Sequence, residues 1–182
     1  LGDVYKRQAI LGAQHPDTLA TQNSLALLYS QLGDFERAED LQADALSSYE
    51  KTLGMTHPGT LMCLNNLAVL YTNMERYDAV EPLYLRALSA CETVLGAEHP
   101  NTLKCVNNLA VLYESQDRLD EAEPLFQRAL TTTAERLGPE HPETLITMEN
   151  LGNLLVNQDR FDEAEPVLSQ TLSGRKKIFG PD

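Results

Sequence analysis

Histidines recur in this sequence at a fixed interval, so they are the first residues to consider for chemistry. Each of the four is followed by proline, and they stand 42 residues apart at His15, His57, His99 and His141. Zinc ligands lie within about 2.1 Å of the ion, whereas equivalent atoms of stacked repeats lie about 10 Å apart. The histidines therefore cannot converge on one metal, and we interpret them as linker residues. The Glu-His pairs at 98–99 and 140–141 lack the helical HExxH spacing.

Other groups that could support catalysis occur without the partners they would need. The sequence contains no GxxxxGK[ST] phosphate loop, no GxGxxG after a strand and no GxSxG elbow. Cys63, Cys91 and Cys105 form no CxxC pair, so we expect small core residues and neither a disulfide framework nor a zinc site. Paired carboxylates such as Glu121 and Glu123 recur with the repeat, as solvated helix surfaces do. We therefore expect no enzyme, no metal and no cofactor.

The overall charge argues against nucleic acid as a partner. The chain has 27 acidic and 14 basic residues, and its net charge of -13 repels phosphate backbones. The short basic cluster at residues 175–177 is expected to be a solvated helix face. No apolar run approaches the ~18 residues of a spanning helix, and the start lacks the apolar stretch of a secretory signal. We therefore expect a cytoplasmic protein with no membrane partner.

The 42-residue period also predicts the elements that position these residues. After each His-Pro pair, apolar residues recur at intervals of three and four, as at Leu61, Leu64 and Leu67, which indicates a helix buried on one face. Proline suits the first helical position, so this helix A should begin at the proline. A short polar turn follows about seventeen residues later, and a second apolar stripe, helix B, runs to a Leu-Gly pair whose glycine suits a left-handed cap.

Two such helices cannot bury both stripes alone, so neighbouring pairs must stack. We predict an all-α solenoid of about four repeats, within a domain spanning residues 9–180; the repeats lie at about 16–54, 58–96, 100–138 and 142–180. Residues 1–8 place Asp3 where the repeats have alanine, and we expect a non-native or disordered start. The chain stops just where another His-Pro pair is due, so we expect a fragment of a longer array.

The helix signatures resemble those of a known repeat. Leu67-Ala68-x-x-Tyr71 and Ala122-x-x-x-Phe126 are similar to the Leu-Gly-x-x-Tyr and Ala-x-x-x-Phe signature of tetratricopeptide repeats. The 42-residue period, the Leu-Gly-x-x-His-Pro linker, and the Leu-Asn-Asn-Leu-Ala and Glu-Pro-Leu runs resemble the kinesin light chain type. The resemblance implies a right-handed superhelix whose A helices line a concave groove.

Candidate groove residues follow from aligning helix A by the period. Asparagine is a poor helix former, so its repetition inside helix A indicates a role there. Its amide can pair with both the N–H and the C=O of an extended peptide. Alternatively, these amides bond the adjacent repeat and fix its stacking. The candidate peptide-binding residues are Asn23, Asn65, Asn66, Asn107, Asn108, Asn150 and Asn153, with Val69, Val111 and Lys104.

The function that the resemblance implies is a protein–protein interaction scaffold or adaptor, which binds an extended segment of a peptide or protein partner in the groove. Lys104 is the only basic residue at a candidate position, so capture of a terminal carboxylate is not expected. The acidic, tryptophan-bearing peptides of the kinesin light chain groove also fit a -13 chain poorly, and a neutral or basic peptide is favoured. The alternative is a structural spacer or regulatory module of a larger multidomain protein, able to self-associate through uncapped ends. A repeat enzyme or small-molecule binder has no motif in support.

Overall fold

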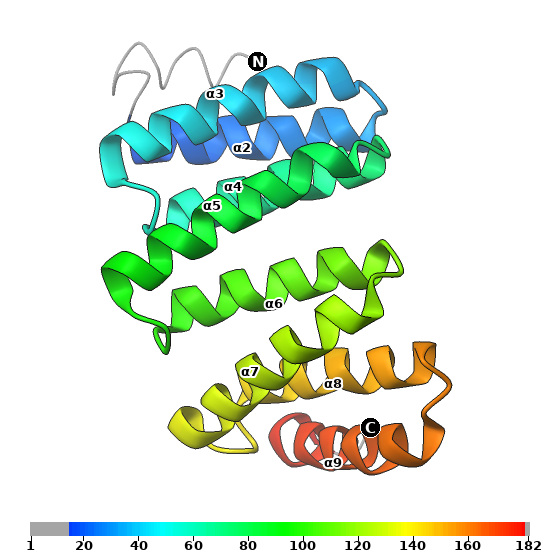
Figure 1. Ribbon diagram of the computed structural model, residues 1–182. Helices are drawn as coiled ribbons and strands as arrows, with labels where there is room; N and C mark the ends of the chain where they lie inside the picture. Colours follow the sequence, from blue (N-terminus) through cyan, green and yellow to red (C-terminus); the bar gives the residue numbers. More distant parts are fainter. Residues whose placement is uncertain (1–14, 181–182) are drawn as a thin grey trace. The chain divides into compact units, whose positions relative to one another are not determined.

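The computed structural model describes residues 15–180, and every regular element within them is a helix (Figure 1). The A helices each have 16 residues and are α2 (Pro16–Gln31), α4 (Pro58–Asn73), α6 (Pro100–Ser115) and α8 (Pro142–Asn157). The B helices each have 19 residues and are α3 (Phe35–Leu53), α5 (Tyr77–Leu95), α7 (Leu119–Leu137) and α9 (Phe161–Phe179). The predicted all-α array of paired helices is confirmed. The expectation for residues 1–8 lies outside the described residues.

The helices belong to two compact units, one ending at Val94 and the other beginning at Leu95. In the first unit, α2 packs on α3, α3 packs on α4, and the A helices α2 and α4 also touch. In the second unit, α6 packs on α7, α7 on α8 and α8 on α9, and again the A helices α6 and α8 touch. The B helices α3 and α7 therefore each pack between two A helices of their unit, as a stacked repeat requires.

The core is built on helix positions where small and large side chains alternate. Ala38, Ala122 and Ala164 are equivalent positions in helix B, and each is at most 2% exposed, so the partner helix can approach closely. Four residues after Ala122, Phe126 is fully buried. None of the described helices is both long and apolar enough to cross a membrane.

Ion pairs link successive repeats within each unit. In the first unit, the Arg76 guanidinium lies 2.7 Å from the Glu39 carboxylate and also stacks over the Tyr71 ring, 4.7 Å from its centroid. In the second unit, Arg160 lies 2.7 Å from Glu123. Because these pairs are partly exposed, they specify the register of stacking more than they add stability.

The linker histidines have a structural role that the sequence did not reveal. Each precedes the first residue of an A helix in an extended conformation, and its Nδ1 accepts a hydrogen bond from the backbone N–H two residues later. These N···N distances are 3.2, 3.0, 3.1 and 3.2 Å for His15, His57, His99 and His141. The imidazole therefore caps the helix, satisfying an N–H that has no partner inside it. Among the described residues, no group of three or more His, Cys, Asp or Glu could hold a metal ion.

Removing one of these caps should be measurable. We expect His57→Ala to lower the free energy of unfolding by about 0.5–2 kcal/mol, because the Gly59 N–H loses its acceptor. Urea denaturation followed by circular dichroism measures the change. His57→Asn is the matched control, since asparagine is a good cap and should retain most of the stability. Equal losses in both variants would show that the ring contributes by packing and not by capping.

Candidate functional site

Two of the candidate amides, Asn23 and Asn65, face helix B of the same repeat. Asn23 is 7% exposed, and its Oδ1 accepts a hydrogen bond from Gln42 Nε2. Asn65 Oδ1 accepts a hydrogen bond from the Tyr84 hydroxyl at 2.8 Å. These two amide oxygens therefore join helix A to helix B within the first and second repeats, a use that neither sequence hypothesis anticipated.

Amides in the second unit join the two A helices. Asn150 Nδ2 donates to Asn107 Oδ1 at 3.0 Å, and Asn157 Nδ2 donates to Glu114 Oε1 at 2.9 Å. Burial raises the pKa of the Glu114 carboxyl, and the Asn157 hydrogen bond opposes that change. Both bonds connect α6 to α8, which matches the hypothesis that some of these amides fix stacking.

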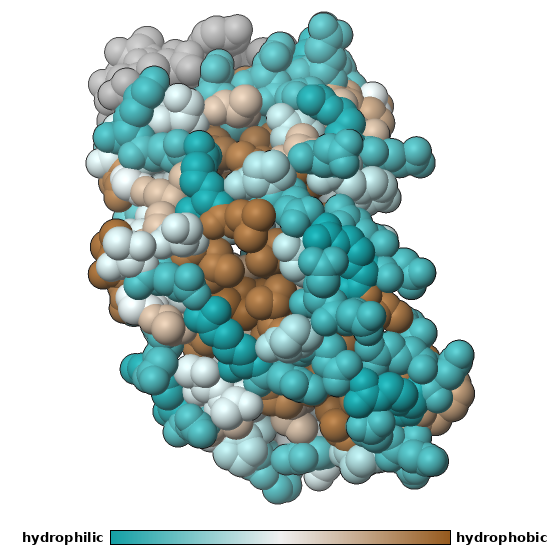
Figure 2. Space-filling view, in the orientation of Figure 1, coloured by the Kyte–Doolittle hydropathy of each residue, from teal (hydrophilic) through white to brown (hydrophobic). Residues whose placement is uncertain are grey.

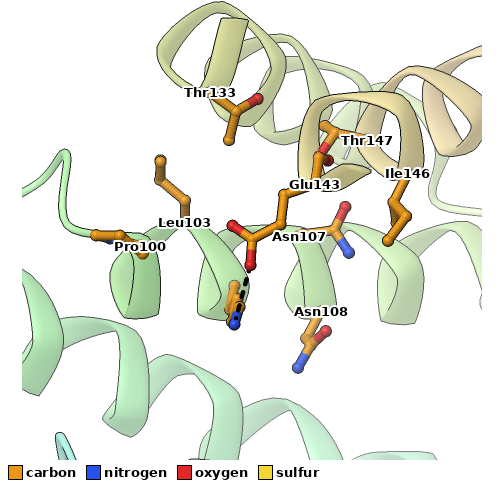
Figure 3. Close-up of a pocket in the computed structure, with 9 residues that line it drawn as sticks. Pro100, Leu103, Asn107, Asn108, Thr133, Glu143, Ile146 and Thr147 are labelled. Atoms are coloured by element: carbon orange, nitrogen blue, oxygen red, sulfur yellow. Dashed lines mark hydrogen bonds and ion pairs between the residues drawn. The ribbon is translucent and has the colours of Figure 1, made fainter. Parts of the chain in front are cut away.

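A pocket of about 280 Å³ lies in the second unit between α6 and α8 (Figure 3). Its lining residues are Pro100, Leu103, Lys104, Asn107, Asn108, Thr133, Glu143, Ile146 and Thr147. The Lys104 ammonium lies 3.1 Å from the Glu143 carboxylate, so the candidate cation is already paired. Ile146 is 48% exposed and offers apolar surface beside this ion pair.

One helix B position that lines the pocket differs in size between the repeats. Thr133 of α7 is at the position that Tyr49 occupies two repeats earlier, and both side chains are buried. In the first unit the Tyr49 ring lies against the start of α4, where a Cβ added to Gly59 would be 3.3 Å from the ring. The Thr133 side chain has no ring, so the space that the Tyr49 ring fills in the first unit is open in the second. This size change along the period is a sequence signal that could have located the pocket.

A second hollow, of about 300 Å³, lies in the first unit between α2 and α4. Its lining residues, all uncharged, are Ala26, Leu27, Ser30, Gln31, Gln42, Asn66, Val69, Leu70 and Asn73. Leu27 and Val69 are 52% and 49% exposed, so apolar surface stands beside the Asn66 amide. Two of the predicted residues, Asn66 and Val69, therefore share one hollow.

The remaining candidates lie outside both cavities. Val111 is 41% exposed on α6, and Asn153 is exposed on α8. Apolar side chains also reach the surface between polar ones on the face shown in Figure 2. Thus Lys104, Asn107 and Asn108 come together in the second unit and Asn66 and Val69 in the first, while Gln42, Thr133 and Glu143 were missed by sequence reasoning.

Repeated helix pairs with cavities between A helices define an α-helical repeat protein. The chain belongs to the tetratricopeptide repeat family, whose model matches residues 4–51, 19–93, 59–135 and 105–177. The predicted resemblance of the chain to kinesin light chain repeats is confirmed by solved structures of similar fold.

Three solved structures illustrate the likeness. A kinesin light chain-like protein of Podosopora anserina with nearly identical repeats is 26% identical, with a TM-score of 0.75 over 96% of this chain and 82% of that one. BtubC (BKLC) from P. vanneervenii is 24% identical, with a TM-score of 0.75 over 100% and 76%. Aspartyl phosphate phosphatase F from Bacillus subtilis is 15% identical, with a TM-score of 0.68 over 90% and 41%. Because the latter two are less than 25% identical to this chain, their similarity shows a shared fold and nothing more. No curated protein matches the sequence.

Proposed function

We propose that this chain is an interaction scaffold whose A helices bind an extended peptide segment of a partner protein. Tetratricopeptide repeat proteins are generally protein-interaction scaffolds and typically lack catalysis. The observation that carries the proposal is the presence, in each unit, of a cavity between two A helices that combines Asn side chains with exposed apolar ones. Such a lining suits backbone hydrogen bonds along a peptide and contacts to a few of its side chains.

Charge narrows the class of peptide. Lys104 is neutralised by Glu143, so the pocket of the second unit offers no unpaired cation for a carboxylate. The hollow of the first unit is lined by uncharged residues, and the chain as a whole carries -13. A neutral or basic segment is therefore favoured over an acidic one. We place the protein in the cytoplasm, because its three cysteines are buried without forming disulfides, which suits a reducing compartment.

A peptide display selection on the whole chain tests the proposal. We expect enrichment of uncharged or basic peptides, and we expect Asn66→Ala combined with Asn108→Ala to weaken the best of them about tenfold or more. Each lost hydrogen bond contributes about 1 kcal/mol net, and 1.4 kcal/mol is a tenfold change. Isothermal titration calorimetry measures the dissociation constant. Asn65 and Asn107 are left unchanged because their amides hold the fold.

The control is Gln127→Ala on the exposed face of α7, which should bind as the parent does. Circular dichroism verifies that all variants remain folded. If the double variant bound as tightly as the parent, the A-helix amides would not contact the ligand. A folded parent that enriches no peptide would favour the spacer or regulatory alternative.

A further inference from the structure

Gln42 departs from the pattern of helix B. The equivalent residues in the later repeats are Tyr84, Phe126 and Leu168, which bring an aromatic or aliphatic side chain to this position. Gln42 is only 3% exposed, and a buried amide is costly unless its polar atoms find partners. Since only the first repeat has an amide side chain at this core position, we infer that Gln42 has a specific role there.

The nitrogen of the Gln42 side-chain amide has hydrogen-bond partners. Its Nε2 donates to the backbone carbonyl of Cys63 at 2.9 Å and to Asn23 Oδ1. Because a carbonyl can only accept, the contact with Cys63 fixes which end of the amide is the nitrogen. The carbonyl end, Oε1, must therefore point away from Cys63.

The carbonyl oxygen of the Gln42 amide has no hydrogen-bond partner among the described residues. Within residues 15–180, no group donates a hydrogen bond to Gln42 Oε1. Among the described residues, the side-chain atom that is both fully buried and without a hydrogen-bond partner is Thr18 Oγ1. Gln42 Oε1 also has no partner but is not fully buried, so it is not sealed from solvent. Gln42 is also one of the residues that line the hollow between α2 and α4. The hollow is thus lined by a residue whose amide orientation is fixed and whose carbonyl oxygen accepts no hydrogen bond within the described residues.

The rest of the lining restricts what can donate to that oxygen. Leu27 and Val69 present exposed apolar surface, and the lining residues are all uncharged. A charged ammonium would lose hydration there without gaining a carboxylate, whereas an amide N–H loses much less.

We propose that this hollow binds an uncharged N–H donor carried next to an aliphatic group, with the N–H bonded to Gln42 Oε1 and the aliphatic group against Leu27 and Val69. In a peptide this is a backbone amide beside an aliphatic side chain. The inference rests on the proposed function in taking a peptide as the natural ligand, and it specifies which part of the peptide the first unit recognises.

A matched pair of small probes tests the site without any peptide. N-isobutylacetamide carries one N–H beside an aliphatic group, and isobutyl acetate has nearly the same shape without the N–H. Titration of the isotopically labelled whole chain, followed by NMR, should shift resonances of Asn66 and Val69 with the amide. The ester should bind about fivefold or more weakly, as the loss of one net hydrogen bond requires. Isobutylammonium should bind more weakly than the amide.

A protein variant completes the comparison. Gln42→Leu introduces the residue found at position 168 and removes the acceptor, so the amide should fall to the affinity of the ester while the ester changes little. Val69→Asn, the residue found at position 153, should weaken both probes alike and leaves the core untouched.

Equal affinity of amide and ester for the parent, or tighter binding of the ammonium, would overturn the proposal. So would the absence of shifts at α2 and α4. Binding of the amide in a protein that enriches no peptide would leave this site intact and reject the peptide-scaffold function instead.

Discussion

Replacing Phe126 by alanine should cost about 3–5 kcal/mol of unfolding free energy, which makes it one of the most damaging single changes in the chain. Phe126 is the largest fully buried side chain among the described residues, and it lies in the middle of α7. Truncation removes the transfer energy of the ring and leaves a cavity between helices that can collapse only in part. Urea denaturation followed by circular dichroism measures the loss.

Two neighbouring changes make this result interpretable. Gln127→Ala alters an exposed residue of the same helix and should stay within about 0.5 kcal/mol of the parent. Phe126→Leu introduces the residue that the fourth repeat has at position 168, and it should lose clearly less than alanine. A loss below about 1 kcal/mol in Phe126→Ala would mean that the surrounding helices close over the gap.

The Cys63 thiol should react about a thousandfold more slowly in the folded protein than a free cysteine does at pH 8. Burial raises the pKa of Cys63 to about 12, the nearby Glu50 charge adds to the rise, and the Gln42 hydrogen bond opposes it. Only the thiolate attacks thiol reagents, and three pKa units correspond to about a thousandfold less of it. A disulfide reagent added with and without urea, with the labelled residue identified by mass spectrometry, measures the protection. Fast labelling of Cys63 in the native protein would contradict it.

The same shift predicts how stability changes in alkali. The folded pKa lies above the unfolded one, so the unfolded chain releases this proton first as the pH rises. The contribution of the thiol is therefore complete below about pH 8.5 and is lost as the pH rises toward 12. Denaturation midpoints of the parent should fall more steeply from pH 8 to 10.5 than those of Cys63→Ala. This comparison separates the cysteine from Tyr49, whose pKa burial also raises.

Helix boundaries were predictable because they depend on short-range chemistry. Pro58 and Gly54 determine where α4 begins and α3 ends through their own backbone preferences, and the period repeats both. The cap by His57 was missed because histidine is not among the residues that usually cap helices, although its Nδ1 reaches the same N–H that a serine oxygen would.

The site was predictable only in part, because side-chain pairing depends on the packing of helices. Asn65 and Asn66 look alike in sequence, yet Asn65 bonds Tyr84 across the helix pair and Asn66 lines the hollow. Which of two adjacent amides faces inward depends on the rotation of helix A against helix B, about 100° per residue. Gln42 carried a sequence signal, its departure from an apolar position, but its unpaired oxygen becomes visible only with the Cys63 carbonyl in place.

The threonine that follows each of the last three His-Pro pairs closes its linker in the same way. Thr60, Thr102 and Thr144 each donate a hydrogen bond from Oγ1 back to a glycine carbonyl six residues earlier, at 2.7, 2.8 and 2.9 Å. Each linker is therefore closed by a bond among its own residues, and the side chains of Arg128 and Lys177 add contacts from the B helix of the repeat that follows. A gene duplication or deletion of 42 codons would reproduce or remove one linker together with one helix pair, whereas a shorter change would break the linker. Such a chain can change its length in evolution by whole modules without redesigning any of them.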